Sequence, residues 1–357
     1  MKYAIIIAAA AARYSTIVVV VGVILGAFLA MHPPAATYAQ STTAANGTGP
    51  ADFNIAAVGD WGCKSATEDT VNNIISKSPE VVLGLGDNAY EDHADCWFDT
   101  LDPIIDKTIT AIGNEDVEPR GNVDEYMNRF GLSEQYYTYR YGNVFVLVMA
   151  SEVPDEEGSA QFDFVERSLS EASSDPDVDW IIVMYHRLMY ASPSASAPSS
   201  GVADTYHEMF EEHGVDLVLQ GHIHNYERSV PIVSDGEESD SPISASTGRE
   251  TYVDPEGQIF ATVGTGGQSI HDFQGKNSFI QVQYEGYGFL DIEIKNGGEG
   301  NSEDGNVQAD DNSDDSSSSS SSSNDDNSED GNNASTLEAT FYANDGSIID
   351  AFTIIKN

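Results

Sequence analysis

Basic residues are scarce in this chain. It has 15 Lys and Arg residues against 59 Asp and Glu residues, which gives a formal net charge of -44. Proteins that bind DNA or RNA neutralise the phosphate backbone with Lys and Arg, so this composition argues against nucleic acid as a partner. The acidity is global, because only 11 of the acidic residues fall between Glu299 and Asp330, where no Lys or Arg occurs. Such a surface keeps a protein soluble through self-repulsion and suits a salty medium.

Cysteine is also rare, with Cys63 and Cys96 as the two copies. Each stands in a loop just after the end of a predicted strand, and neighbouring strands would bring the two loops together. The pair is therefore either a disulfide, which an oxidising compartment would favour, or two free buried thiols.

A run without any charge stands near the N-terminus. Lys2 and Arg13 precede residues 16–31, which are rich in Val, Ile, Leu and Ala, and residues 37–39 resemble a small-residue cleavage site. The run is slightly short of the roughly 20 apolar residues that span a bilayer. Residues 1–39 are therefore either a cleaved signal peptide or a retained membrane anchor. Both interpretations predict an extracytoplasmic protein, secreted or anchored on the outer face of the cell membrane, and residues 40–50 read as a polar linker.

The rest of the chain, residues 51–357, is long enough for one catalytic domain. Of the whole chain, 40% is hydrophobic, which is ample for a packed core. Residues 296–335 interrupt this pattern, because they consist mainly of Gly, Asn, Asp, Glu and Ser and cannot build a core. Strand patterns return on both sides of this tract. We therefore interpret it as a disordered acidic insertion between strands of one domain.

Polar residues follow three apolar strands in the first part of this domain. Asp60 follows the strand predicted at 53–58, Asp87 the strand at 81–85, and Asn114 the strand at 108–112. Helical segments are predicted between them, at 66–77 and 95–107. Alternating strands and helices indicate parallel strands, whose carboxyl ends share the edge at which open α/β sheets place their sites.

Histidines follow two later strands in the same way. His186 ends an apolar run at 180–185, and His222 and His224 follow the run at 215–219, with Gly221 allowing a tight loop. Helices are predicted at 159–173 and 204–212. The other predicted strands are 136–141, 144–149, 229–233, 258–263, 279–284, 288–295, 336–342 and 348–355.

Together these strand ends carry carboxylates, an amide, a phenol and imidazoles, a set that suits two borderline or hard metal ions bridged by one aspartate. The candidate ligands are Asp60, Asp87, Tyr90, Asn114, His186, His222 and His224.

The order Asp, Asp-x-x-Tyr, Asn, His, His-x-His resembles the calcineurin-like metallophosphoesterases. The motifs at 59–62, 86–90 and 221–228 are most similar to the purple acid phosphatase branch, and Tyr90 is the residue that selects it. The resemblance extends from about residue 54 to residue 267. It implies an α/β fold, a four-layer αββα sandwich of two mixed β-sheets flanked by helices.

The resemblance also implies two ions and an acid phosphatase activity. A first ion, ferric iron, would be held by Asp60, Tyr90 and His224. A second ion, divalent Fe, Zn or Mn, would be held by Asn114, His186 and His222, with Asp87 between the two. A phenolate stabilises a trivalent ion and would colour the protein. Two cations lower the pKa of bound water from 15.7 toward roughly 7, and the resulting hydroxide would hydrolyse small-molecule phosphomonoesters.

Glu115 departs from the family pattern, in which a histidine follows the asparagine, helps to hold the phosphate and protonates the leaving group. A carboxylate carries no positive charge and donates a proton only if its pKa is raised. The general acid is therefore open among Glu115, His93 and His271. Arg187 is a candidate for contact with the substrate phosphate, or else for a surface ion pair. Two other functions stay open, a phosphodiesterase or nucleotide hydrolase on the same metals and a non-catalytic surface binding protein.

Overall fold

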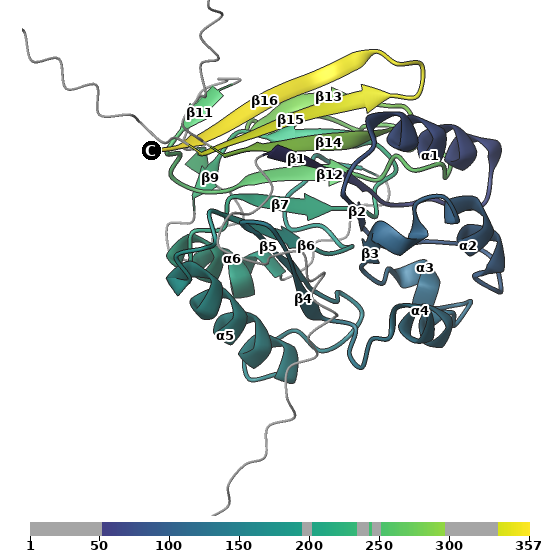
Figure 1. The fold of residues 1–357 in the computed structure, drawn as a ribbon, viewed down its shortest axis with the longest axis horizontal. Coiled ribbons are helices and arrows are strands. Elements are labelled where there is room, and N and C mark those ends of the chain that lie inside the picture. The colour runs from purple at the N-terminus through teal and green to yellow at the C-terminus, as the bar shows by residue number, and fades with distance from the viewer. Residues whose placement is uncertain (1–51, 195–201, 234–242, 245–250, 297–334) are drawn as a thin grey trace, which may run out of the picture. The chain divides into compact units, whose positions relative to one another are not determined.

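The computed structural model describes residues 52–194, 202–233, 243–244, 251–296 and 335–357 (Figure 1). All of them belong to one compact unit, Ala35–Asn357. The predicted leader at 1–39, the linker at 40–50 and nearly all of the predicted acidic insertion lie outside the described residues. Within the part of the chain that the structure describes, no helix combines the length and the apolar character needed to cross a membrane.

The first sheet has seven strands and contains the three parallel strands that the sequence predicts. β1, β2 and β3 run parallel, so their carboxyl ends share one edge, whereas β14 pairs antiparallel with β1. The sheet continues through β14, β15 and β16, which pair antiparallel, to β11 at the far edge. In order across the sheet, the strands are β11 (Thr251–Val253), β16 (Ile348–Lys356), β15 (Ser335–Ala343), β14 (Gly288–Lys295), β1 (Asp52–Val58), β2 (Val81–Gly84) and β3 (Thr108–Thr110).

The second sheet also has seven strands and is mixed as well. β5, β6, β7 and β12 run parallel, and antiparallel strands complete it at both sides. In order, its strands are β13 (Ile280–Tyr284), β8 (Tyr226–Ser229), β12 (Ile259–Val263), β7 (Leu217–Gln220), β6 (Trp180–Met184), β5 (Val144–Val148) and β4 (Tyr137–Tyr141). A separate pair consists of β9 (Ile232–Val233) and β10 (Ile243–Ser244).

Two groups of helices flank the sheets (Figure 1). The first group follows the parallel strands of the first sheet: α1 (Ser65–Lys77), α2 (Asp95–Leu101), α3 (Asn114–Val117) and α4 (Val123–Phe130). The second group lies beside the second sheet: α5 (Ala160–Ser174) and α6 (Val202–Glu212). The N-cap of α5 is Ser159, whose side chain accepts a hydrogen bond from the backbone N–H of Phe162.

Alternation within the strands divides the core into two layers. In β6, Trp180, Ile182 and Met184 belong to the cluster that includes both sheets. Ile181 and Val183 belong instead to the cluster that includes the buried side of α5 and α6. Because successive side chains of a strand point to opposite faces, β6 is buried on both faces and is apolar throughout. This layering confirms the predicted sandwich of two mixed sheets flanked by helices.

Several elements differ from the sequence-based expectation. The helical segment predicted at 95–107 is divided, because Pro103 has no backbone N–H to continue a helix; α2 ends at Leu101 and a 3-10 turn follows at Ile105–Lys107. Helix α4 was not predicted. The strand predicted at 229–233 is wrong in its bounds, since β8 covers Tyr226–Ser229 and therefore begins two residues after His224.

Candidate metal centre

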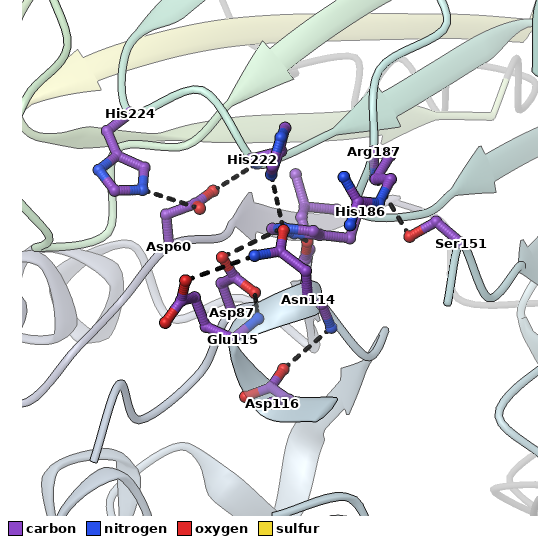
Figure 2. Close-up of polar contacts among 12 residues, drawn as sticks. Asp60, Asp87, Asn114, Glu115, Asp116, Ser151, His186, Arg187, His222 and His224 are labelled. Atoms are coloured by element: carbon purple, nitrogen blue, oxygen red, sulfur yellow. Dashed lines mark hydrogen bonds and ion pairs between the residues drawn. The ribbon is translucent and has the colours of Figure 1, made fainter. Parts of the chain in front are cut away.

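The seven candidate ligands come from loops at the ends of five strands and meet in one place. Asp60, Asp87 and Asn114 follow β1, β2 and β3, while His186 and the pair His222 and His224 follow β6 and β7. Figure 2 shows the labelled members of this set pointing toward one another between the two sheets. Residues separated by as many as 164 positions are thus brought together, where strand ends of the first sheet meet strand ends of the second.

Four of these side chains form a first group around the phenol of Tyr90. Its Oη lies 3.0 Å from Asp60 Oδ1, 3.0 Å from Asp87 Oδ2 and 3.0 Å from His224 Nε2. His224 Nε2 is in turn 3.3 Å from Asp60 Oδ1. Two carboxylates, a phenol and an imidazole therefore present donor atoms to one point.

A second group forms around the ring of His186. Its Nε2 lies 3.2 Å from Asp87 Oδ2, 3.2 Å from Asn114 Oδ1 and 3.3 Å from His222 Nδ1. The donor atoms of Asp87, His186 and His222 all lie within 4.8 Å of one another, which is close enough to hold one ion. Asp87 Oδ2 belongs to both groups, so the two donor sets are adjacent and share a carboxylate.

The backbone at these positions is unusual. In the described part of the chain, six residues other than glycine have a positive φ, and four of them are candidate ligands: Asp60, Asp87, Tyr90 and His222. This left-handed conformation is uncommon for residues with a Cβ and costs free energy, and such positions cluster at functional sites. The fold thus maintains strained loops at the positions that aim donor atoms into the centre.

Close backbone contacts hold these loops in place. A Cβ on Gly113 would lie 2.2 Å from Asp87 Oδ1, and a Cβ on Gly221 would lie 2.9 Å from Asp60 Oδ2, so both positions require glycine. Asp60 Oδ2 also accepts a hydrogen bond of 2.8 Å from the backbone N–H of His222. The loops therefore position one another as well as their own side chains.

Backbone carbonyls orient two of the histidine rings. His186 Nδ1 lies 2.9 Å from the carbonyl oxygen of Leu85, and His224 Nδ1 lies 2.7 Å from that of Ser269. Each Nδ1 therefore carries the proton, which leaves Nε2 to face the centre. Hydrogen bonding of the remote ring nitrogen is the usual way in which a protein orients a metal-binding histidine.

The charges of the centre are strongly coupled. Burial raises the pKa of Tyr90 well above its usual value, and Asp60 and Asp87 raise it further. Burial alone would lower the pKa of His186, but the adjacent Asp87 carboxylate raises it to about 10. Burial and the neighbouring His186 lower the pKa of His222 to about 4. Tyr90 and His186 therefore hold protons at positions that cations would take, so we expect metal binding to release protons.

The donor set has the chemistry that two such ions require. Carboxylate, phenol and amide oxygens suit hard cations, and imidazole suits borderline cations such as Fe and Zn. A family model for calcineurin-like phosphoesterases matches residues 53–226, which contain all seven candidate ligands. This part of the chain matches the calcineurin-like phosphoesterase family, as the sequence predicts.

The relatives of this chain include plant phosphatases. It is 23% identical to phosphoenolpyruvate phosphatase of Allium cepa, over 69% of this chain and 56% of that protein. It is 21% identical to purple acid phosphatase 15 of Arabidopsis thaliana, over 60% of this chain and 44% of that protein. The predicted purple acid phosphatase branch is thereby confirmed, and the chain spans about half the length of these two relatives.

A solved structure shares the fold. The purple acid phosphatase from seeds of yellow lupin (Lupinus luteus) aligns with a TM-score of 0.62 at 18% sequence identity, over 88% of this chain and 56% of that chain. This similarity confirms the predicted fold class.

The three general-acid candidates lie in different environments. His271 stacks on His224, with ring centroids 3.9 Å apart, so the structure brings it to the centre. The side chain of His93 is 77% exposed and lies 3.1 Å from Glu125, and no contact joins it to the candidate ligands. Glu115 stands beside Asn114, but its carboxylate forms an ion pair with Arg120.

Arg187 adjoins the centre and is engaged in an ion pair. Its Nε and Nη2 contact the two carboxylate oxygens of Glu152 at 2.6 and 3.1 Å. Its backbone N–H donates to Ser151 Oγ at 3.4 Å, a contact that Figure 2 marks. The ion pair that the sequence left as the alternative is therefore present.

Asp116 is a buried residue of the site that sequence reasoning missed. Its carboxylate accepts hydrogen bonds from the backbone N–H groups of Asn88 and Gly113, at 3.0 and 2.9 Å, and from the Asn88 amide at 3.1 Å. It thus ties the loop of Asp87 to the loop of Asn114. Burial and the nearby Asp87 raise the pKa of Asp116 to about 7. Its position two residues after Asn114 was the one available signal.

A disulfide joins Cys63 and Cys96, which confirms the bridge and excludes the free thiols. Cys63 follows the loop of Asp60, and Cys96 lies in α2. The bridge therefore connects the segments that follow β1 and β2, as the adjacency of those strands predicts.

Proposed function

We propose that this protein is a dinuclear-metal phosphatase that hydrolyses phosphomonoesters. The observation that supports it most is the pair of donor groups that share Asp87 Oδ2. Separations of roughly 3.5–4 Å between ions bridged by a carboxylate are typical of hydrolases with two metals. The plant phosphatases among its relatives support the same chemistry.

In this proposal each donor group holds one ion. Asp60, Tyr90 and His224 would hold a ferric ion, because a phenolate and a carboxylate are hard anionic donors. Asn114, His186 and His222 would hold a divalent ion, Fe, Zn or Mn, and Asp87 would serve both donor groups. When bound, two such cations lower the pKa of water and neutralise charge on a phosphoryl group.

The side chains around the donor groups bind and orient the substrate. His271 Nδ1 accepts a hydrogen bond of 3.2 Å from the backbone N–H of His224, so the neutral ring carries its proton on Nε2. His271 is therefore the best placed of the three candidates to donate a hydrogen bond to the ester. Burial and the adjacent His224 lower the pKa of His271, which favours that neutral form.

We also infer that the protein works outside the cytoplasm on small phosphoesters. The Cys63–Cys96 disulfide supports an oxidising compartment. The uncharged run at 16–31 supports export, with a cleaved signal peptide or a membrane anchor as the two forms.

The test is turnover by protein loaded with iron and a divalent metal, in high salt that screens the acidic surface. We expect p-nitrophenyl phosphate to be hydrolysed faster than bis(p-nitrophenyl) phosphate. Asp87→Ala and His222→Ala should each lower turnover at least about 100-fold and lose bound metal. His213→Ala, which removes a histidine that contacts Ser173, is the matched control and should change neither.

Two outcomes would refute the proposal. Faster turnover of the diester would indicate a phosphodiesterase on the same metals. Stable binding of both metals without turnover of either ester would indicate a binding protein.

A further inference from the structure

Arg120 lies on a loop that is fixed between two of the ligand loops. Two residues after it, Asn122 donates through Nδ2 to the carbonyl oxygen of Glu91 at 2.8 Å, next to Tyr90. The backbone N–H of Asn122 donates to the carbonyl oxygen of Asp116 at 2.8 Å. The loop is thus held to the Tyr90 segment on one side and to the Asn114 segment on the other, which fixes Arg120 at the edge of the centre.

The Arg120 guanidinium is separated from the ligand Asn114 by one carboxylate. Arg120 Nη1 contacts Glu115 Oε2, and Glu115 Oε1 lies 3.5 Å from Asn114 Nδ2. The Asn114 amide presents its other atom, Oδ1, to His186 at 3.2 Å. The backbone N–H of Glu115 donates to Asp87 Oδ1 at 2.8 Å, which anchors this residue against the shared ligand.

Arg120 is less engaged than Arg187 and Arg228. An arginine side chain has five N–H donors. Arg187 uses two of them on Glu152, and the buried Arg228 uses three on Asp350 and Tyr252. Among the described residues, Glu115 is the one carboxylate within 4.0 Å of Arg120. The Arg120 side chain is 24% exposed, so it is partly buried and still accessible from solvent.

We propose that Arg120 is a substrate-binding residue that contacts the phosphoryl oxygens of the ester, and that Glu115 holds it in place until the phosphate arrives. This inference rests on the proposed phosphatase function. Planar guanidinium groups bind phosphate through paired, charge-assisted hydrogen bonds. In a chain with a net charge of -44, a cation at the site also offsets the repulsion of an anionic substrate. Glu115 then competes with phosphate for the same guanidinium.

With this role for Arg120, removal of the two partners of the ion pair changes phosphate affinity in opposite directions. Removal of Arg120 weakens phosphate binding, because the hydrogen bonds to a charged group are lost. Removal of the Glu115 charge leaves phosphate binding equal or tighter, because the competing anion has gone. If Glu115 were instead the general acid, its loss would slow turnover without a change in phosphate affinity. If the pair served to hold Asn114, loss of either residue would release metal.

The experiment is calorimetric titration of inorganic phosphate into the metal-loaded protein, with metal content measured for every variant. We expect Arg120→Ala to weaken phosphate binding roughly 10- to 100-fold. Arg120→Lys should recover part of this loss, since it keeps the charge but not the planar fork. Glu115→Gln should bind phosphate at least as tightly as the wild type. The control is Arg129→Ala, which removes an arginine paired with the exposed Asp106 and should change nothing.

The outcomes separate this inference from the proposed function. Equal phosphate affinity in Arg120→Ala and Arg129→Ala, with normal metal content, would overturn the role of Arg120 and leave the phosphatase intact. Loss of metal in both Glu115→Gln and Arg120→Ala would overturn it as well, in favour of a positioning role. Wild-type protein that holds both metals and neither binds phosphate nor hydrolyses esters would overturn the proposed function itself.

Discussion

Substitution of Asp350 by alanine should destabilise the protein strongly, because Asp350 neutralises a buried arginine between the two sheets. Arg228 of β8 donates from Nε to Asp350 Oδ2 at 2.6 Å and from Nη2 to Oδ1 at 2.9 Å. Tyr226 Oη donates to the same carboxylate at 2.7 Å. The Arg228 and Asp350 side chains are 1% and 4% exposed. This pair links β8 in the second sheet to β16 in the first.

The size of the effect follows from this burial. Removal of one partner of a buried ion pair leaves an uncompensated charge and typically costs about 3–5 kcal/mol. We therefore expect Asp350→Ala to lower the free energy of unfolding by that amount. An exposed pair in the first sheet gives the comparison, Lys295 with Glu338, whose side chains are 42% and 40% exposed. Glu338→Ala should cost less than about 1 kcal/mol.

The assay is urea unfolding monitored by tryptophan fluorescence, with the disulfide intact. A third variant, Arg228→Met combined with Asp350→Leu, tests the cause. It removes both charges, so it should recover most of the stability that Asp350→Ala loses. If Asp350→Ala and Glu338→Ala cost the same, or if the double variant is no more stable than Asp350→Ala, the unpaired charge is not the reason and the argument fails.

Two further substitutions test the site and the pH dependence of stability. Tyr90→Phe should abolish the visible absorption band and weaken retention of the ferric ion, because the phenolate donor is lost; visible spectra with metal analysis check this, and an unchanged band would remove the reason for placing ferric iron there. His207 is buried, with Nδ1 2.6 Å from Tyr190 Oη and Nε2 3.3 Å from the Ile232 carbonyl oxygen. Burial lowers the pKa of His207 below 6.5. The stability from this neutral form is present above pH 6.5 and is lost as the pH falls through the folded-state pKa. His207→Gln should therefore flatten the decline in the urea midpoint between about pH 8 and about pH 5. An equal decline in this variant and in the wild type would count against His207 as the source.

The candidate ligands could be predicted because they follow a regular pattern of buried strands. Asp60 and Asp87 each follow an apolar run and a glycine, and His186 directly follows an apolar run. Parallel strands of one sheet bring such positions to one edge. The strand pattern therefore indicated the candidate positions, and the resemblance to the metallophosphoesterases indicated that two sheets bring them together. The strained backbone at Asp60 and Asp87 could not be predicted in the same way, since it depends on the packing of one loop against the next.

The misplaced strand β8 has a different physical cause. The strand predicted at 229–233 leaves out Glu227 and Arg228, and charged residues are rarely buried. Both are buried here: Glu227 Oε1 accepts from the backbone N–H of Ser192 at 2.7 Å, and Arg228 is neutralised by Asp350. The partner of Arg228 stands 122 positions later in the chain. A charged residue with a distant partner has no local signal of its burial, so the strand was assigned too late.

The three general-acid candidates show why distance along the chain does not decide a role. His93 stands three residues after Tyr90, yet its ring is exposed and contacts Glu125. His271 stands 47 residues after His224, yet the two rings stack and His271 Nδ1 accepts from the His224 backbone. Glu115 directly follows the candidate ligand Asn114, and its carboxylate forms an ion pair with Arg120. In each case the residue that pairs with the side chain determines what it can donate or accept, and that partner becomes known only once the loops are folded against one another.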